Sequence, residues 1–339
     1  MKAVILTGRH EAHLGEFPAP PMDANAVKVA VAYCGICGTD LHKFDGKSGS
    51  RPLRLPVPLG HEISGVVEEV GANVTQFRPG DRVTVDPNWS CGGCRMCKAG
   101  LTHMCENSRG VVKGMADFIC PPQENVYPIP ASLSLRDAAL AEPLSCCLRG
   151  MDLLDVRLGQ SVVIVGMGAI GAIMVQLCKR ACAAEIIVIE PVEEKREKAF
   201  ALGATRFINP MKDDPAAAIA AMGIGNVDRV MECVGLPATI TTALDVAGKC
   251  ATVVLFGLCD PEKTVPFNQY AAFTKELTIR TSFINPHTTA RAIALLASGA
   301  IDTDAVISAE ISPEAVVDEL RSRTLSRQGK VLVKWKEFE

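Results

Sequence analysis

The stretch VVIVGMGAIG, residues 162–171, decides the fold of the second half of the chain. Its first four residues are apolar and rich in valine, which predicts a buried strand. The glycines that follow, Gly166-x-Gly168-x-x-Gly171, predict a tight turn that opens a helix. In such a turn the first glycine allows the sharp bend, the second lets a pyrophosphate approach the backbone, and the third lets helix and strand pack closely. A glycine-rich turn without a ligand is the alternative.

An acidic residue downstream favours the nucleotide interpretation. Glu190 ends the next predicted strand, in EIIVIEP (residues 185–191), about 20 residues after the glycines, where a carboxylate can bind both ribose hydroxyls of an adenosine. The same charge repels a 2′-phosphate, so we predict NAD rather than NADP. Backbone N–H groups of Ala169 and Ile170 would face the phosphates at the helix N-terminus. Lys195 is either a second ribose contact or part of a solvated helix face.

The two parts of the chain differ in pattern. From about residue 157 strands and helices alternate, and six strands can be counted, which predicts a parallel, doubly wound Rossmann sheet in residues 151–284. Residues 1–150 carry short Val-rich runs bounded by Gly, Pro and Asp, typical of an irregular β-barrel. Residues 285–339 contain an amphipathic helix and a final strand. The fold class is therefore α/β, with a β-barrel domain and a nucleotide-binding domain.

Composition excludes several functions. The chain has 339 residues, 48% of them hydrophobic and 22% charged, with a formal net charge of −3. Neither a nucleic-acid partner nor an anionic membrane is expected for such a charge. No run of about 20 apolar residues is present, and the N-terminus becomes polar too early for a secretory signal. We predict a cytoplasmic protein.

Fourteen cysteines in a long chain of this kind predict metal ligands and small buried side chains rather than disulfides. One cluster is Cys91, Cys94, Cys97 and Cys105, in CGGCRMCKAGLTHMC, and a catalytic centre, a redox switch or a structural site are open interpretations. An iron–sulfur site is disfavoured, because the ferredoxin pattern places its fourth cysteine three residues on and follows it with proline. Most of the nine cysteines outside this cluster and outside Cys37, such as Cys178 and Cys182, are expected in the core.

A second set of metal-binding residue types lies in CGICGTDLH, LGHEISG and LAEPLSCC. Its members are Cys37, Thr39, His42, His61, Glu62 and Glu142. Cysteine, histidine and carboxylate suit zinc, and catalytic zinc has three protein ligands and one open position. Each residue is a weak signal by itself, since a lone histidine is more often a core residue.

Taken together, these stretches resemble the zinc-dependent medium-chain alcohol dehydrogenases, in particular the sorbitol and threonine (polyol) dehydrogenase branch. The resemblance rests on GICGTDLH, PLGHEISGVVEEVG, FRPGDRV, CGGCRMC, AEPLS, the glycine pattern and RAIALLASGAID, which follow the family order over the whole chain. It implies a GroES-like barrel onto which residues 285–339 return, and a homodimer or homotetramer. It also implies two zinc ions per chain, one of them structural and held by the four clustered cysteines.

The resemblance further implies how the second set works. Cys37 and His61 bind the catalytic zinc, with Glu62 or Glu142 as the carboxylate ligand. The substrate alkoxide gives its hydride to NAD, and its proton leaves through the hydroxyl of Thr39, the nicotinamide ribose and the imidazole of His42.

The substrate is expected to be a polyol, sugar alcohol or sugar derivative, with threonine or a short-chain secondary alcohol as the alternative. A nucleic-acid-binding protein built on the cysteine cluster is a remote alternative, which the net charge disfavours. Ile284 and Asn285 stand where sorbitol enzymes have an Arg-Tyr pair, so sorbitol itself is not predicted. Arg51 and Arg54 are candidates for a phosphate or carboxylate contact, although the favoured interpretation is that they are surface arginines.

Overall fold

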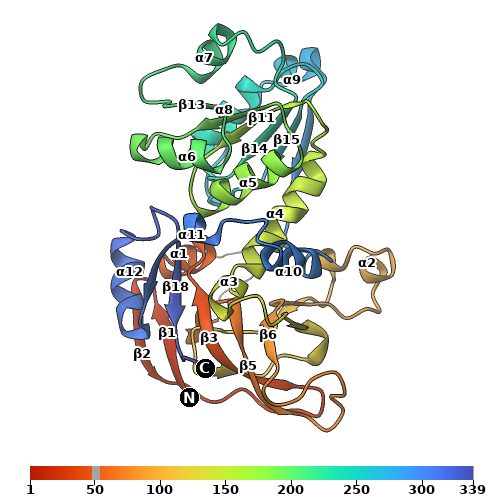
Figure 1. Ribbon diagram of the computed structural model, residues 1–339, viewed down its shortest axis with the longest axis vertical. Coiled ribbons are helices and arrows are strands. Elements are labelled where there is room, and N and C mark those ends of the chain that lie inside the picture. The colour runs from red at the N-terminus through yellow and green to blue at the C-terminus, as the bar shows by residue number, and fades with distance from the viewer. Residues whose placement is uncertain (48–53, 339) are drawn as a thin grey trace. The chain divides into compact units, whose positions relative to one another are not determined.

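The computed structural model describes residues 1–47 and 54–338 (Figure 1). The chain folds into two compact units. One combines Met1–Ser145 with Asn285–Glu339, and the other is Cys146–Ile284. Arg51 lies outside the described residues, and Arg54 is exposed.

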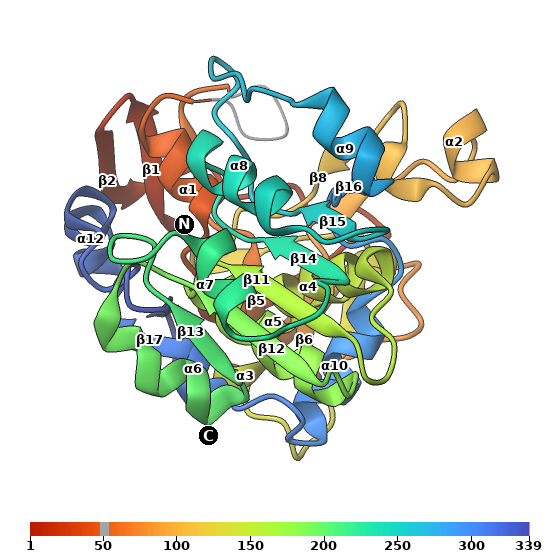
Figure 2. The same ribbon diagram turned by 90° about the horizontal axis from the view of Figure 1, so that it is seen from above.

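The unit Cys146–Ile284 is built on six parallel strands, which confirms the predicted sheet. In chain order they are β11 (Ser161–Val165), β12 (Glu185–Ile189), β13 (Arg206–Ile208), β14 (Arg229–Glu232), β15 (Thr252–Leu255) and β16 (Thr278–Thr281). Their spatial order is β13-β12-β11-β14-β15-β16, which Figure 2 shows from above. The order reverses between β11 and β14, and ligands of such sheets bind at the carboxyl ends of the strands at that point.

Helices cover both faces of this sheet. They are α5 (Ala169–Arg180), α6 (Arg196–Leu202), α7 (Pro215–Ala221) and α8 (Pro237–Val246), with a 3₁₀ turn at Glu193–Lys195. A further helix, α9 (Gln269–Lys275), precedes β16 and has no buried residue. Val163 and Val165 pack in one core with Ile219 of α7 and Val246 of α8. The alternate strand residue, Ile164, faces α5 instead. Because both faces are buried, residues 162–165 of β11 are all apolar rather than alternating.

The expectation for the isolated cysteines was wrong. Only Cys34, Cys147 and Cys178 of the nine are buried, and Cys182 is exposed. The reason at Cys182 is local, because α5 ends at Arg180 and Cys182 takes a left-handed conformation with φ 57°. The helix therefore ends two residues before Cys182, although the apolar periodicity of the sequence continues.

The other unit is β-rich, as predicted. Its smaller sheet has the order β2-β1-β4, with β1 at Lys2–Gly8, β2 at Glu11–Glu16 and β4 at Val57–Pro58. Its larger sheet has the order β10-β6-β5-β3-β18-β17, and β9 (Phe118–Ile119) also pairs with β3. The bounds are β3 Val27–Gly35, β5 Glu62–Val70, β6 Arg82–Val85, β10 Val126–Pro128, β17 Ile307–Ile311 and β18 Lys330–Lys334. The end of the chain thus completes a sheet that the beginning of the chain started.

Short helices join these strands. They are α1 (Gly38–Phe44), α2 (Arg95–Lys98), α3 (Leu135–Ala138), α10 (Thr289–Ala297), α11 (Thr303–Val306) and α12 (Val316–Ser322), with 3₁₀ turns at Thr102–Met104, Gln123–Asn125 and Pro313–Ala315. A two-stranded ribbon, β7 (Asn88–Trp89) with β8 (Arg109–Gly110), closes the base of the cysteine-rich lobe. The helix α4 (Ala141–Leu154) contains the boundary between the two units. None of the helices in the described ranges is long and apolar enough to cross a membrane.

Candidate functional site

The turn after β11 has the backbone that the glycine pattern predicts. Gly166 takes φ 98°, a region that side chains disfavour. A Cβ on Gly171 would lie 2.0 Å from the carbonyl oxygen of Gly166, so this position needs glycine for close packing. A Cβ on Gly168, the N-cap of α5, would meet nothing within 4 Å. The N-terminus of α5, with Ala169 and Ile170 in its first turn, therefore opens onto free space where an anion can approach.

Glu190 follows β12 directly, one residue beyond the strand end at Ile189. It is buried, and its carboxylate accepts hydrogen bonds from the backbone N–H groups of Met167 (2.6 Å) and Val192 (3.2 Å). Lys195 Nζ lies 3.6 Å from Glu190 Oε1. The acid therefore holds the glycine turn and Lys195 together, a connection that spacing alone did not reveal.

A second acidic residue lies at the carboxyl ends of these strands, and the sequence pattern did not predict it. Glu232, the last residue of β14, is fully buried and accepts hydrogen bonds from the N–H groups of Val234 (2.9 Å) and Gly235 (2.8 Å) and from the hydroxyl of Thr239 (2.7 Å). A Cβ on Gly166 would lie 2.5 Å from the side chain of Val234. Glu232 therefore fixes the β14–α8 turn against the glycine turn, at the point where the strand order reverses.

The metal-binding residue types of the β-rich unit also come together. One ligand atom each of Cys37, His61 and Glu62 lie within 4.8 Å of one another. Cys37 is the N-cap of α1, and Glu62 is the first residue of β5. Thr39 and His42, three residues apart on α1, are both half-buried.

Asp40 holds the two metal-binding loops together. It is fully buried, and its carboxylate accepts hydrogen bonds from the N–H groups of Cys37 (3.0 Å) and Gly60 (3.1 Å). His61 Nδ1 lies 3.9 Å from Asp40 Oδ1. Such contacts orient the ligands of a metal site.

Glu142 lies in the first turn of α4, and its environment couples it to the same cluster. Burial raises the pKa of Glu142 to about 8; His61 opposes the rise, whereas the charges of Glu62 and Cys37 add to it. Burial, with the charge of Glu62, also raises the pKa of Cys37 to about 12. Both groups are thus costly to ionise unless a cation is beside them.

A lysine beside this cluster, Lys330, supplies a positive charge, and the sequence did not predict it. It is only 5% exposed, and its Nζ donates to both carboxylate oxygens of Glu62, at 2.6 and 2.7 Å. Lys330 balances the charge of Glu62. A Cys37 thiolate and a Glu142 carboxylate would then carry two negative charges, which a divalent ion balances. The donor set therefore fits zinc.

The four clustered cysteines fit a closed metal site. One ligand atom from each of them lies within 4.8 Å of the others. The Sγ–Sγ distances are 3.9 Å for Cys94–Cys105 and 3.6 Å for Cys91–Cys105, close to the ~3.8 Å edge of a tetrahedron with zinc–sulfur bonds of about 2.3 Å. Hydrogen bonds from Asn107 and from the N–H of Cys94 lower the pKa of Cys91 to about 6, which favours the thiolate that a metal needs.

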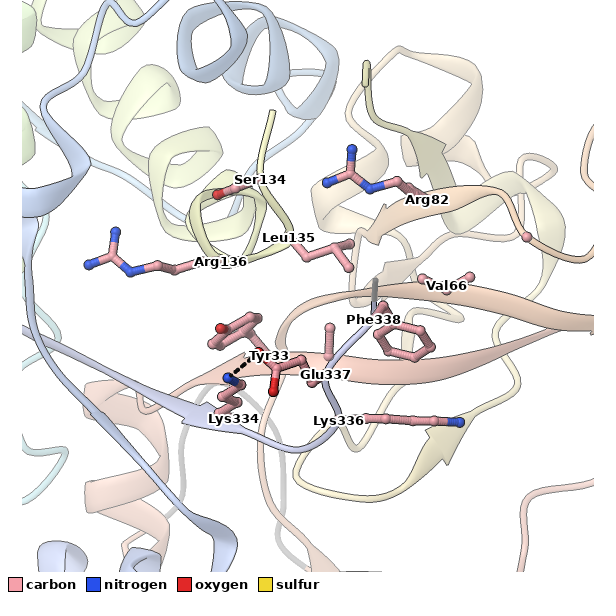
Figure 3. Close-up of a pocket in the computed structure, with 12 residues that line it drawn as sticks. Tyr33, Val66, Arg82, Ser134, Leu135, Arg136, Lys334, Lys336, Glu337 and Phe338 are labelled. Atoms are coloured by element: carbon pink, nitrogen blue, oxygen red, sulfur yellow. Dashed lines mark hydrogen bonds and ion pairs between the residues drawn. The ribbon is translucent and has the colours of Figure 1, made fainter. Parts of the chain in front are cut away.

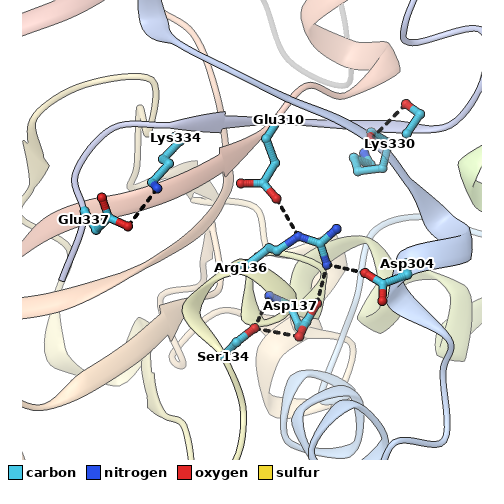
Figure 4. A network of polar contacts seen from close by, with 9 residues as sticks. Ser134, Arg136, Asp137, Asp304, Glu310, Lys330, Lys334 and Glu337 are labelled. Carbon is cyan, nitrogen blue, oxygen red and sulfur yellow. Dashed lines mark hydrogen bonds and ion pairs between the residues drawn. The ribbon is translucent and has the colours of Figure 1, made fainter. Parts of the chain in front are cut away.

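A hollow of about 650 Å³ in the same unit is lined by four cations, Arg82, Arg136, Lys334 and Lys336 (Figure 3). Arg136 of α3 is the centre of a network, with ion pairs to Asp304 of α11 (2.8 Å) and Glu310 of β17 (2.7 Å) (Figure 4). Lys334 pairs with Glu337, Lys336 pairs with Glu68, and Arg82 donates to two backbone carbonyls. Carboxylates and carbonyls thus engage these cations, and the network ties α3 to β17 and α11.

Comparison with known proteins agrees with this geometry. Residues 23–131 match the model of the alcohol dehydrogenase GroES-like domain, and residues 169–298 match that of the zinc-binding dehydrogenases. The chain is 32% identical to the sorbitol dehydrogenase of Bacillus subtilis (strain 168) over 327 residues, which cover 94% of this chain and 92% of that protein. It is 34% identical to the L-threonine 3-dehydrogenase of Caldanaerobacter subterraneus subsp. tengcongensis over 269 residues, covering 77% of this chain and 76% of that one.

A crystal structure of a zinc-binding dehydrogenase from Sinorhizobium meliloti 1021, bound to NADP, superimposes with a TM-score of 0.92 at 36% identity, covering 98% of both chains. The fold and the donor sets thus define a metal-dependent oxidoreductase that uses a nicotinamide cofactor. The chain belongs to the zinc-type medium-chain alcohol dehydrogenase family, in its polyol dehydrogenase branch.

Proposed function

We propose that this enzyme moves a hydride between a secondary alcohol of a polyol, sugar alcohol or sugar derivative and the nicotinamide of NAD. The observation that carries the proposal is the cluster of the half-buried Cys37 and His61 with the buried Glu62, to which Glu142 is coupled electrostatically. The similarity to a sorbitol dehydrogenase supports the substrate class.

For the catalytic metal we propose Cys37 and His61 as ligands, with Glu62 or Glu142 as the carboxylate ligand. A carboxylate oxygen of Glu62 lies within 4.8 Å of the ligand atoms of Cys37 and His61, and the hydrogen bonds from Lys330 leave Glu62 lone pairs for a metal. A zinc ion held there would lower the pKa of an alcohol hydroxyl, and NAD would supply the hydride acceptor. Asp40 holds the Cys37 and His61 loops at a fixed separation. Cys91, Cys94, Cys97 and Cys105 are proposed to hold the structural zinc.

Proton transfer is assigned to α1. We expect the Thr39 hydroxyl to accept the proton of the substrate hydroxyl while it gives up its own proton, and the His42 imidazole to take up a proton from the site and release it to solvent. Both side chains are half-buried, so they can exchange protons with the site and with water. On the nucleotide side, Gly166, Gly168 and Gly171 would bind the pyrophosphate.

The substrate preference follows from the polar character of the centre. Carboxylates beside the metal offer hydrogen-bond acceptors that a hydrocarbon alcohol cannot use, and unpaired acceptors are costly in a closed site. A molecule with adjacent hydroxyls can satisfy them. Asn285 is buried and binds Asn88 (2.8 Å) and Thr289 (3.4 Å), so its amide is engaged within the protein.

The test is a comparison of specificity constants, followed by NADH absorbance, for ethanol, 2-butanol, threonine, sorbitol and a series of polyols, cyclitols and sugars. We expect a polyhydroxylated secondary alcohol to give the highest kcat/KM, and sorbitol to be poor. A wide margin in favour of simple aliphatic alcohols would overturn the polyol assignment. A wide margin for threonine would support the second candidate function, an L-threonine dehydrogenase. The similarity to a threonine dehydrogenase favours this candidate.

Glu190→Ser is expected to narrow the preference for NAD over NADP by about tenfold, a change of about 1.4 kcal/mol. The carboxylate that repels a 2′-phosphate is then removed. The readout is the ratio of kcat/KM with NAD to kcat/KM with NADP. A ratio is needed because loss of the hydrogen bond to Met167 should weaken the binding of both cofactors. Glu185→Ser, at the opposite end of β12, is the control and should leave the ratio unchanged. Equal use of NAD and NADP by the unaltered enzyme would contradict the assignment.

We expect a homodimer or homotetramer in the cytoplasm. The strand β16 lies at an edge of the six-stranded sheet, and its four residues are exposed. Beside it in the sequence, Tyr270 and Phe273 of α9 are each 75% exposed, and large aromatic side chains of this kind mark protein interfaces. Light scattering after size-exclusion chromatography measures the mass. A monomer at micromolar concentration would contradict this expectation.

A further inference from the structure

Three cations lie at the corner of the nucleotide-binding unit that carries Glu190. Lys195 ends the 3₁₀ turn after β12, Arg196 begins α6, and Lys212 follows β13. The N–H of Glu190 donates to the carbonyl oxygen of Ile208 at 3.0 Å, so the ends of β12 and β13 meet here. Cations beside the adenosine ribose are the groups that bind the 2′-phosphate of NADP. Their contacts therefore bear on the choice between NAD and NADP.

Glu193 engages two of these cations. Its carboxylate accepts hydrogen bonds from the guanidinium of Arg196 and, at 3.2 Å, from the ammonium of Lys212. Asn209 Nδ2 donates to the same carboxylate at 3.0 Å and to the carbonyl oxygen of Pro191 at 3.1 Å, which ties the cluster to the end of β12. The hydrogen bonds from Arg196, Asn209 and Lys212 lower the pKa of Glu193 to about 2, so this carboxylate is charged at neutral pH.

The two cations that Glu193 holds lie at the surface. The side chains of Arg196, Lys212 and Glu193 are 38%, 63% and 39% exposed. Arg196 also lies over the ring of Phe207, 4.4 Å from its centroid, which keeps the guanidinium at this corner. Ion pairs at such exposed positions are weak and are screened by salt. Arg196 and Lys212 can therefore turn to a phosphate once Glu193 no longer competes for them.

The third cation has an acidic partner as well. Lys195 Nζ lies 3.6 Å from Glu190 Oε1, so Glu190 engages one cation and Glu193 engages two. A 2′-phosphate at this corner would have to displace the Glu193 carboxylate and would be repelled by its charge. The ribose hydroxyls of NAD need only a hydrogen-bond acceptor, which Glu190 supplies.

We propose that Glu193 is a specificity-determining residue, which withholds Arg196 and Lys212 from the 2′-phosphate of NADP. Its effect adds to that of Glu190, because Glu190 repels the phosphate at the ribose whereas Glu193 occupies the cations that would bind it. This inference rests on the proposed use of NAD and deepens it.

The experiment measures the dissociation constants of NAD and NADP for the full-length protein by isothermal titration calorimetry, without an alcohol present. The two cofactors differ only in the 2′-phosphate, so the ratio of their dissociation constants isolates its contribution. Glu193→Gln keeps the size of the side chain and removes its charge. In this variant we expect NADP to bind about tenfold more tightly, the effect of one charge-assisted hydrogen bond, while the binding of NAD stays close to that of the wild type. The gain for NADP should shrink at high salt.

Two further variants test the cause of the gain. Adding Arg196→Gln and Lys212→Gln to Glu193→Gln removes the released cations, and the affinity for NADP should return to the wild-type value. Glu194→Gln is the matched control, because Glu194 is the next residue and is exposed. It changes the net charge by the same amount and should leave both dissociation constants unchanged. Wild-type binding of NAD in each variant shows that the nucleotide site is folded.

An unchanged affinity for NADP in Glu193→Gln would overturn the inference, as would an equal gain in Glu194→Gln. A gain that salt does not reduce, or that persists without Arg196 and Lys212, would also overturn it. These results are distinct from failure of the proposed function. A wild type that binds NADP as tightly as NAD contradicts the proposed use of NAD, and this inference with it. A wild type that binds NAD but oxidises no alcohol tested contradicts the substrate assignment, and the dissociation constants still decide the role of Glu193.

Discussion

Cys37→Ser is expected to lower kcat by at least about a thousandfold, because a Lewis-acid metal contributes several kcal/mol to the transition state and each 1.36 kcal/mol is a factor of ten. Cys37 is half-buried at the N-cap of α1, and serine supports the same cap. The fold should therefore persist, with a thermal midpoint within a few degrees of the wild type. NADH formation with the best substrate, metal content and thermal unfolding measure the three quantities.

The control for that experiment is Cys250→Ser, because Cys250 is exposed and belongs to neither metal cluster. It should retain full turnover and metal content. If Cys37→Ser keeps a tenth or more of the wild-type activity, Cys37 is not a ligand of the catalytic metal.

Cys94→Ser is expected to remove one zinc per chain and to destabilise the protein strongly. Structural zinc sites contribute apparent binding energies of about 10–16 kcal/mol in small domains, a magnitude comparable with the stability of a whole domain. The lobe between β7 and β8 has little secondary structure or apolar packing of its own to stabilise it. Its helix α2 has four residues, and Leu101 and Met104 are over 40% exposed. Thermal unfolding and metal analysis on the same sample check the result.

Cys182→Ser is the matched control, since Cys182 is exposed and lies outside the metal clusters. It should retain two zinc ions and the wild-type midpoint. A Cys94→Ser protein that still carries two zinc ions, or that unfolds at the wild-type temperature, would show that the cluster is not a structural zinc site.

The nucleotide-binding fold could be predicted because its signals are local. Residues 162–171 specify a strand, a turn and a helix start, and the backbone at Gly166 and Gly171 excludes other residues for steric reasons. The alternation of strands and helices then fixes a parallel sheet. The prediction was less accurate at element ends, as at Cys182, because a single left-handed residue ends a helix whose apolar period continues.

The cysteine cluster could be proposed for the same reason, since its four members lie within 15 residues and a short lobe must bring them together. The residues proposed for the catalytic metal come from three separate segments. They were grouped because their motifs follow the order seen in the family, and no spacing between them indicated a common site. Their roles as ligands stay predictions. The choice between Glu62 and Glu142 could not be made from the sequence, because it depends on how the distant segments that carry these acids approach Cys37 and His61.

Lys330 shows what only the tertiary structure decided. It lies on the same strand as Lys334, four residues away, so the strand period places both lysines on one face. One is buried against Glu62, 268 residues earlier in the sequence, and the other pairs with Glu337 at the surface. The sequence determined the strand, the glycine turn and the clustered cysteines, because neighbouring residues and backbone sterics control them. Long-range strand pairing determined the partners of Lys330 and Glu62, since the electrostatic environment of a buried charge depends on which distant strands meet around it.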